Sequence, residues 1–122
     1  MRSLVAAIIS LPLLAPGTPV DFARDVLPIL SDACFHCHGP DEKQREAKLR
    51  LDTKEGLYRS SDGITVVVPG KPGDSDLVVR VTSKDRDEVM PPPKANRQLT
   101  PPEIATLQRW VAEGAPFGRH WA

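Results

Sequence analysis

The segment Cys34-Phe35-His36-Cys37-His38 holds the residues of this chain best suited to chemistry. Its two thiols are three positions apart, so one helical turn places them on the same face. There each thiol can add to one vinyl group of a single porphyrin, and the histidine that follows can bind the iron of that ring through a neutral imidazole. The C-x-x-C-H spacing is typical of c-type haem attachment. Since the motif occurs once, we predict that Cys34, Cys37 and His38 hold one covalent haem c.

Met90 is the residue that we predict to be the second axial ligand. It is the only methionine besides the initiator, and it precedes three prolines that keep the backbone extended and stiff. A thioether suits haem iron and raises its reduction potential relative to two imidazoles. With both axial positions filled the iron has no open site, so we expect an electron carrier and not an enzyme. A methionine that fills a gap in the core is the alternative.

Four further side chains are weaker candidates for a part in the site. His36 lies between the cysteines and is expected to point to solvent, and His120 near the chain end is an alternative sixth ligand. Arg50 or Lys48 can pair with a haem propionate, although a solvated charge is the commoner role of such a residue.

Two other uses of the thiols compete with haem attachment. A thiol–disulfide oxidoreductase places its C-x-x-C after a strand and at the start of a helix. Here an apolar helical pattern precedes the motif, no βαβ pattern surrounds it, and His38 would have no role. A structural zinc site draws a second ligand pair from a separate group of similar spacing, and the sequence has none.

The length and charge of the chain limit its class. Its 122 residues are enough for one domain, and a formal net charge of zero suggests no nucleic-acid partner. Residues 1–17 combine Arg2 with an apolar run of signal-peptide length, too short to span a bilayer comfortably. We therefore predict a signal peptide at 1–17, a domain at 20–122 and export to the bacterial periplasm or beyond. An uncleaved leader would be the one membrane contact.

Helical periodicity and turn residues predict the elements that position the motif. A helix capped by Asp21 is expected to run to the motif, with Pro28 as a kink or a new first turn, and to end at Gly39. A second helix is expected after Asp74 or Ser75. The clearest helix has Thr100 as N-cap, Glu103 completing a capping box, and Gly114 as its stop. Between these, short extended segments are expected at 49–52 and 64–68, a weak helical turn at 53–61 and a turn at 69–73.

Several motifs in one order resemble the planctomycete-type cytochrome c domain from about Val20 to the chain end. They are, with their residue numbers, CFHCHGPD (34–41), LRLD (49–52), VVPGKP (67–72), MPPP (90–93), LTPPE (99–103) and HWA (120–122). The resemblance implies a small all-α, class I-like cytochrome c fold with long Pro/Gly-rich loops around the haem. It also implies Cys34, Cys37 and His38 as the attachment residues and Met90 as the distal ligand.

The resemblance also bears on partners. In that family the domain usually opens a much larger exported protein, whereas this chain stops at Ala122. We predict an exported monohaem cytochrome that transfers single electrons to a redox partner protein or to a downstream domain. The alternative is a haem module of a larger exported enzyme or complex. The sequence leaves the partner's identity, the reduction potential and the oligomeric state open.

Overall fold

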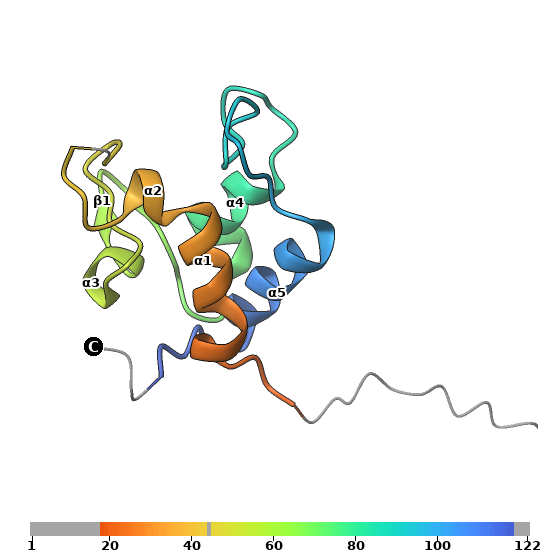
Figure 1. Ribbon diagram of the computed structural model, residues 1–122. Coiled ribbons are helices and arrows are strands. Elements are labelled where there is room, and N and C mark those ends of the chain that lie inside the picture. Colours follow the sequence, from red (N-terminus) through yellow and green to blue (C-terminus); the bar gives the residue numbers. More distant parts are fainter. Residues whose placement is uncertain (1–17, 44, 119–122) are drawn as a thin grey trace, which may run out of the picture.

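The computed structural model describes residues 18–43 and 45–118, and helices predominate among them (Figure 1). The predicted signal peptide at 1–17 and His120 lie outside these residues. In chain order the elements are the π-helix η1 (Phe22–Val26), helices α1 (Leu27–Ala33), α2 (Phe35–His38) and α3 (Lys54–Leu57), strands β1 (Ser60–Ser61) and β2 (Ile64–Thr65), the 3-10 helix η2 (Pro72–Asp74), and helices α4 (Asp76–Thr82) and α5 (Pro101–Ala112).

The first helical segment begins and breaks as its sequence predicts. The Asp21 carboxylate accepts a hydrogen bond from the Arg24 amide and so caps η1. Pro28 lies in the first turn of α1, directly after the π-helix passes into the α-helix, so a second helix begins at this proline as one of the two predicted alternatives had it. Phe22, Val26 and Leu30 are buried, so their helical spacing produces one apolar face.

A short antiparallel hairpin departs from the all-α prediction. Ser60 pairs with Thr65 and Ser61 with Ile64, and the turn between them contains Gly63 at a φ of +80°. The β-branched run at 64–68 therefore contributes only a two-residue strand. Beyond it, the carbonyl of Val66 accepts a hydrogen bond from Leu77 at the start of α4, which ties the hairpin to the helices.

Helix α5 has the ends that the sequence predicts. The Thr100 hydroxyl accepts from the Glu103 amide at 3.3 Å, and the Glu103 carboxylate accepts from the Thr100 amide at 2.9 Å. This reciprocal capping box satisfies two amides that the helix leaves unpaired. At the other end Gly114 adopts a φ of +104°, a conformation that favours glycine and terminates the helix.

Ser75 precedes α4 but does not cap it with its side chain. Its buried hydroxyl accepts a hydrogen bond from the Val68 amide and donates to the Lys71 carbonyl. The prediction that Asp74 or Ser75 caps this helix is thus correct for Ser75 in position, while the hydroxyl closes the preceding turn. A buried hydroxyl must find partners, and the turn supplies both.

The apolar core joins η1, α1, α4 and α5. Trp110 is fully buried beside Phe22, with ring centroids 5.5 Å apart, and its indole N–H donates to the Pro116 carbonyl at 2.8 Å. The buried hydrophobic residues are Val20, Phe22, Val26, Ile29, Leu30, Leu51, Leu57, Val67, Leu77, Val78, Val81, Leu107, Trp110, Val111 and Ala115. Leu51 and Leu57 extend this core beneath the loop that follows the motif.

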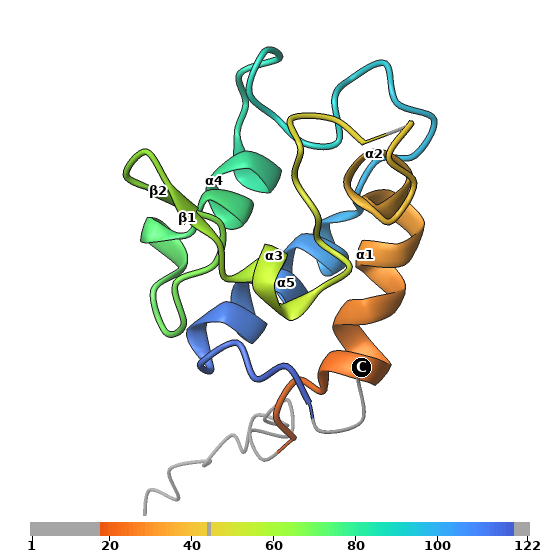
Figure 2. The same cartoon turned by 90° about the vertical axis from the view of Figure 1, so that its left-hand side faces the viewer.

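Two long loops lie on the same side of the molecule as α2. Figure 2 shows the segment after α2 and the segment between α4 and α5 at the end opposite the two described chain ends. The Cys-x-x-Cys-His segment is therefore bordered by loops, while the packed helices form the base beneath it. No helix among the described residues is long and apolar enough to span a membrane.

Candidate haem site

The Cys-x-x-Cys-His segment forms one helical turn at the end of α1. The carbonyl of Cys34 accepts hydrogen bonds from the amides of Cys37 at 3.2 Å and His38 at 2.8 Å. These bonds fix the backbone relation between the two thiols and the imidazole. In such a turn residues three positions apart lie on one face of the helix, so the spacing of the motif places both thiols on the same side.

The loop after the motif folds back onto the end of this turn. The Glu46 amide donates to the Cys37 carbonyl at 2.6 Å, and the Leu51 amide donates to the His38 carbonyl at 2.7 Å. The Arg45 guanidinium donates to the carbonyls of Gly39 and Pro40. Carbonyls that the end of α2 leaves without helical partners are thus satisfied by one loop.

Gly39 is required where this turn ends, and the reason is steric. A Cβ at this position would lie 2.2 Å from the Phe35 carbonyl oxygen. The φ of Gly39 is −126°, which any residue can adopt, so the close approach of the Phe35 carbonyl from the start of the same turn explains the glycine.

The His38 ring buries one of its two nitrogens. Nδ1 is the only fully buried side-chain nitrogen or oxygen without a hydrogen-bond partner in the part of the chain that the structure describes. Burial lowers the pKa of His38, and the backbone of Glu46 and Leu49 opposes that shift. The lowered pKa favours the neutral ring, which is the form that binds iron, and Nδ1 is the nitrogen that the fold buries.

The thiols suit thioether formation better than thiol exchange. Cys34 and Cys37 are half-buried and form no disulfide, and Cys34 packs against the apolar core. Burial raises the pKa of the Cys34 thiol to about 12, whereas redox-active C-x-x-C motifs work through a thiol of lowered pKa. Among the described His, Cys, Asp and Glu residues no group of three or more could hold a metal ion, so the zinc alternative gains no support.

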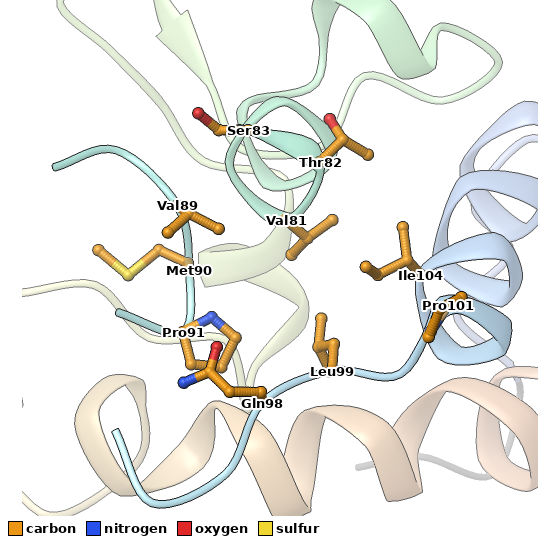
Figure 3. Close-up of a pocket in the computed structure, with 10 residues that line it drawn as sticks. All are labelled: Val81, Thr82, Ser83, Val89, Met90, Pro91, Gln98, Leu99, Pro101 and Ile104. Atoms are coloured by element: carbon orange, nitrogen blue, oxygen red, sulfur yellow. The ribbon is translucent and has the colours of Figure 1, made fainter. Parts of the chain in front are cut away.

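Met90 lies on the edge of an apolar cavity of about 440 Å³ between α4, α5 and the loop that joins them. The cavity is lined by Val81, Thr82, Ser83, Val89, Met90, Pro91, Gln98, Leu99, Pro101 and Ile104. Figure 3 shows the thioether of Met90 extending away from Leu99 and Ile104, whose side chains point into the cavity. The Met90–Pro91 peptide bond is cis.

The structure does not bring Met90 and the motif residues into one cavity. Cys34, Cys37 and His38 do not line the cavity on which Met90 lies. Leu99 and Ile104 connect the two, because both line the cavity and both pack against the same apolar core as Cys34. The lining of the cavity is mostly apolar, as a porphyrin ring requires, but the structure does not bring the three motif residues into it.

The structure distinguishes the weaker candidates for the site by their exposure and by their partners. His36 is exposed, as predicted, and Lys48 is an exposed loop residue. Arg50 forms a bidentate pair with Asp52, at 3.0 Å from Nε to Oδ1 and 2.5 Å from Nη2 to Oδ2. Its guanidinium therefore already has an anionic partner, which reduces the case for a propionate contact.

Arg97 is the side chain near the motif that the sequence did not single out. It pairs with Glu103 at 2.6 Å and approaches Asp32 of α1 at 3.8 Å. Its positive charge acts on Cys34 against the effect of burial, lowering the pKa of that thiol. An arginine in a Pro-rich polar loop carries no motif of its own, so only the folded chain reveals its place.

Comparison with known proteins identifies the family. The family model described as Planctomycete cytochrome C matches residues 34–94, which is half of the chain. This chain belongs to the planctomycete cytochrome c family. The match begins at Cys34 and includes Met90, so it covers both the motif and the loop that carries Met90. Membership implies covalently bound haem c, as the sequence predicts.

This cytochrome c domain was also compared with solved structures and with curated proteins. A solved structure titled "Kuenenia stuttgartiensis Hydrazine Synthase" is 27% identical, with a TM-score of 0.47, over 79% of this chain. The chain spans only 16% of the length of that structure's chain. The comparison with curated proteins gives no match.

Proposed function

We propose that this protein is an exported monohaem cytochrome c that carries single electrons and is not itself an enzyme. The haem supplies an iron that alternates between ferrous and ferric states. The polypeptide would hold this haem and supply its protein ligands. The observation that carries the proposal is the helical turn that holds His38, with its buried Nδ1, and two free thiols, in a chain of this family.

Each residue of the proposed site has one task. Cys34 and Cys37 form the thioethers, His38 provides the proximal nitrogen, and Met90 provides the distal sulfur. The burial of His38 Nδ1 and the place of Met90 among the residues that line the cavity support these roles. A thioether in the sixth position leaves no site for a substrate, which favours electron transfer over catalysis. The electron partner is proposed to be a redox protein or a further domain.

The test uses the full chain, exported in a bacterial host with a c-type maturation system. Denaturing extraction removes loosely held haem, and absorption spectra of the oxidised and reduced protein are then recorded. We expect covalent haem and a methionine-to-ferric charge-transfer band that Met90→Ala abolishes. Val89→Ala is the matched control, because Val89 lines the same cavity but cannot bind iron. The intact mass of the exported protein also tests removal of residues 1–17.

Three outcomes would each overturn a stated part of the proposal. Covalent haem without the charge-transfer band would remove Met90 from the iron and favour a ligand-binding or catalytic role. A spectrum without covalent haem, with both thiols free or joined in a disulfide, would reject haem attachment. Retention of the leader in the exported protein would reject the signal peptide.

A further inference from the structure

The loop that carries Met90 runs from residue 83 to residue 100 without a helix or strand. A segment of this length can place one side chain accurately only if contacts hold it, because each freed residue gains conformational entropy. The contacts of the loop fall into two groups, one before Met90 and one after it.

The first group ties the loop to α4. The Met90 amide donates to the Arg80 carbonyl at 3.1 Å, and the Ser83 hydroxyl donates to the Glu88 carboxylate at 2.7 Å. Arg80 also donates from Nη1 to the Glu88 carbonyl at 3.3 Å. These bonds hold the backbone up to Met90, but they do not restrain the proline-rich stretch beyond it.

The second group centres on Arg97. Its Nη1 and Nη2 donate to the two carboxylate oxygens of Glu103 at 2.9 and 2.6 Å, and Nη2 lies 3.8 Å from an oxygen of Asp32. Gln98, the next residue, donates from its side-chain Nε2 to the Pro92 carbonyl at 2.8 Å. One guanidinium thus joins the Met90 loop to the start of α5 and to α1, two residues before Cys34.

The geometry of this pair gives it more weight than an ordinary surface ion pair. A bidentate arginine–carboxylate contact fixes orientation as well as distance. The side chains of Arg97 and Glu103 are 35% and 22% exposed. Glu103 is itself held by the capping box of α5, so the arginine is attached to a rigid element. The third member, Asp32, is 72% exposed and adds less.

We propose that Arg97 is a positioning residue that holds the Met90 loop against the motif helix and so keeps the thioether in place on the iron. The inference rests on the proposed ligation by Met90. An external ligand that displaces the thioether must also pay the cost of moving this loop. Loosening the Arg97 contacts lowers that cost and therefore raises the apparent affinity of the external ligand.

Imidazole titration of the ferric holoprotein tests the proposal. Loss of the methionine charge-transfer band reports displacement, and Arg97→Gln should bind imidazole about fivefold more tightly, equivalent to about 1 kcal/mol. Arg97→Lys keeps the charge but loses the fork, so an intermediate affinity is expected. Glu103→Gln preserves an acceptor for the Thr100 amide while weakening the pair, and it should shift the affinity in the same direction.

Arg24→Gln is the matched control, since Arg24 forms a bidentate pair with Asp25 in η1 that does not involve the loop. Its imidazole affinity should equal that of the unaltered protein. If Arg97→Gln leaves the affinity unchanged, or Arg24→Gln shifts it equally, the role of Arg97 is rejected while Met90 ligation stands. If the unaltered protein lacks the charge-transfer band, the ligation itself fails. A denaturant midpoint for each variant separates loop release from global destabilisation, and an affinity shift that merely follows that midpoint rejects the role.

Discussion

Replacement of Gly39 by alanine tests whether the end of the motif turn is as tightly packed as the structure indicates. The added Cβ would meet the Phe35 carbonyl oxygen at 2.2 Å, whereas ordinary contact begins at 3.4 Å, so a movement of about 1.2 Å is needed. The obstacle is backbone that belongs to the motif turn itself. It cannot rotate away as a side-chain end would.

The expected cost follows from that geometry. Forced overpacking in a well-packed region typically costs 1–3 kcal/mol, and we expect about 2 kcal/mol for Gly39→Ala. The movement would also disturb the Gly39 carbonyl, which accepts a hydrogen bond from Arg45 at 2.9 Å. The displaced backbone includes Phe35, which lies between the two cysteines of the motif. The fraction of purified protein that carries covalent haem should therefore fall as well.

Gly73→Ala is the matched control for this substitution. Gly73 is exposed in η2, and apart from Gly73 and its two chain neighbours no residue has a heavy atom within 4 Å of the site its Cβ would occupy. Alanine there should leave the stability unchanged or raise it by up to about 1 kcal/mol, because it restricts the unfolded chain.

Urea unfolding of the holoproteins, with midpoints compared at equal slope, gives the free-energy differences. Haem content per purified chain is measured on the same samples. If Gly39→Ala unfolds at the same midpoint as Gly73→Ala and loads haem equally, the steric reasoning is wrong.

Two further predictions concern the core and the pH dependence of stability. Trp110→Phe keeps an aromatic ring in a fully buried position but leaves the Pro116 carbonyl without its indole donor. The free energy of unfolding in urea should therefore fall by about 1–2 kcal/mol. An unchanged urea midpoint would contradict this prediction. The hydrogen bond to Arg97 lowers the pKa of Glu103 from 4.5 to about 2, so this carboxylate stabilises the fold fully above pH 4.5 and progressively less as the pH falls toward 2. After allowance for screening by solvent, this carboxylate contributes about 1 kcal/mol to the free energy of unfolding. In Glu103→Gln the free energy of unfolding should therefore fall less steeply between pH 5 and pH 2 than in the unaltered protein. An equally steep fall in both proteins would refute the prediction.

The sequence alone predicted the elements whose causes are local. The capping box of α5 depends on Thr100 and Glu103 three positions apart, and the structure contains both of its hydrogen bonds. The helical motif turn, the break at Pro28 and the stop at Gly114 likewise follow from residues within one turn of each other. The family was also evident from short motifs, since covalent attachment of a haem needs thiols and a histidine at fixed spacing.

The folded structure decided which atoms meet, both within turns and between distant segments. The hairpin of β1 and β2 exists because Ser60–Ser61 meets Ile64–Thr65, and its short strands carry little sequence signal. The sequence predicted Gly39 as the end of the motif helix, but only the folded backbone shows that the Phe35 carbonyl leaves no room for a Cβ there. The Ser75 hydroxyl bonds to Val68 and Lys71 rather than capping α4, which the sequence did not indicate. The place of Arg97 between Glu103 and Asp32 depends on α1 lying beside the loop that leads into α5. Of these contacts the one between Arg97 and Asp32 joins segments far apart in the sequence, while the others depend on the exact course of the local backbone, and no periodicity or spacing in the chain encodes either kind.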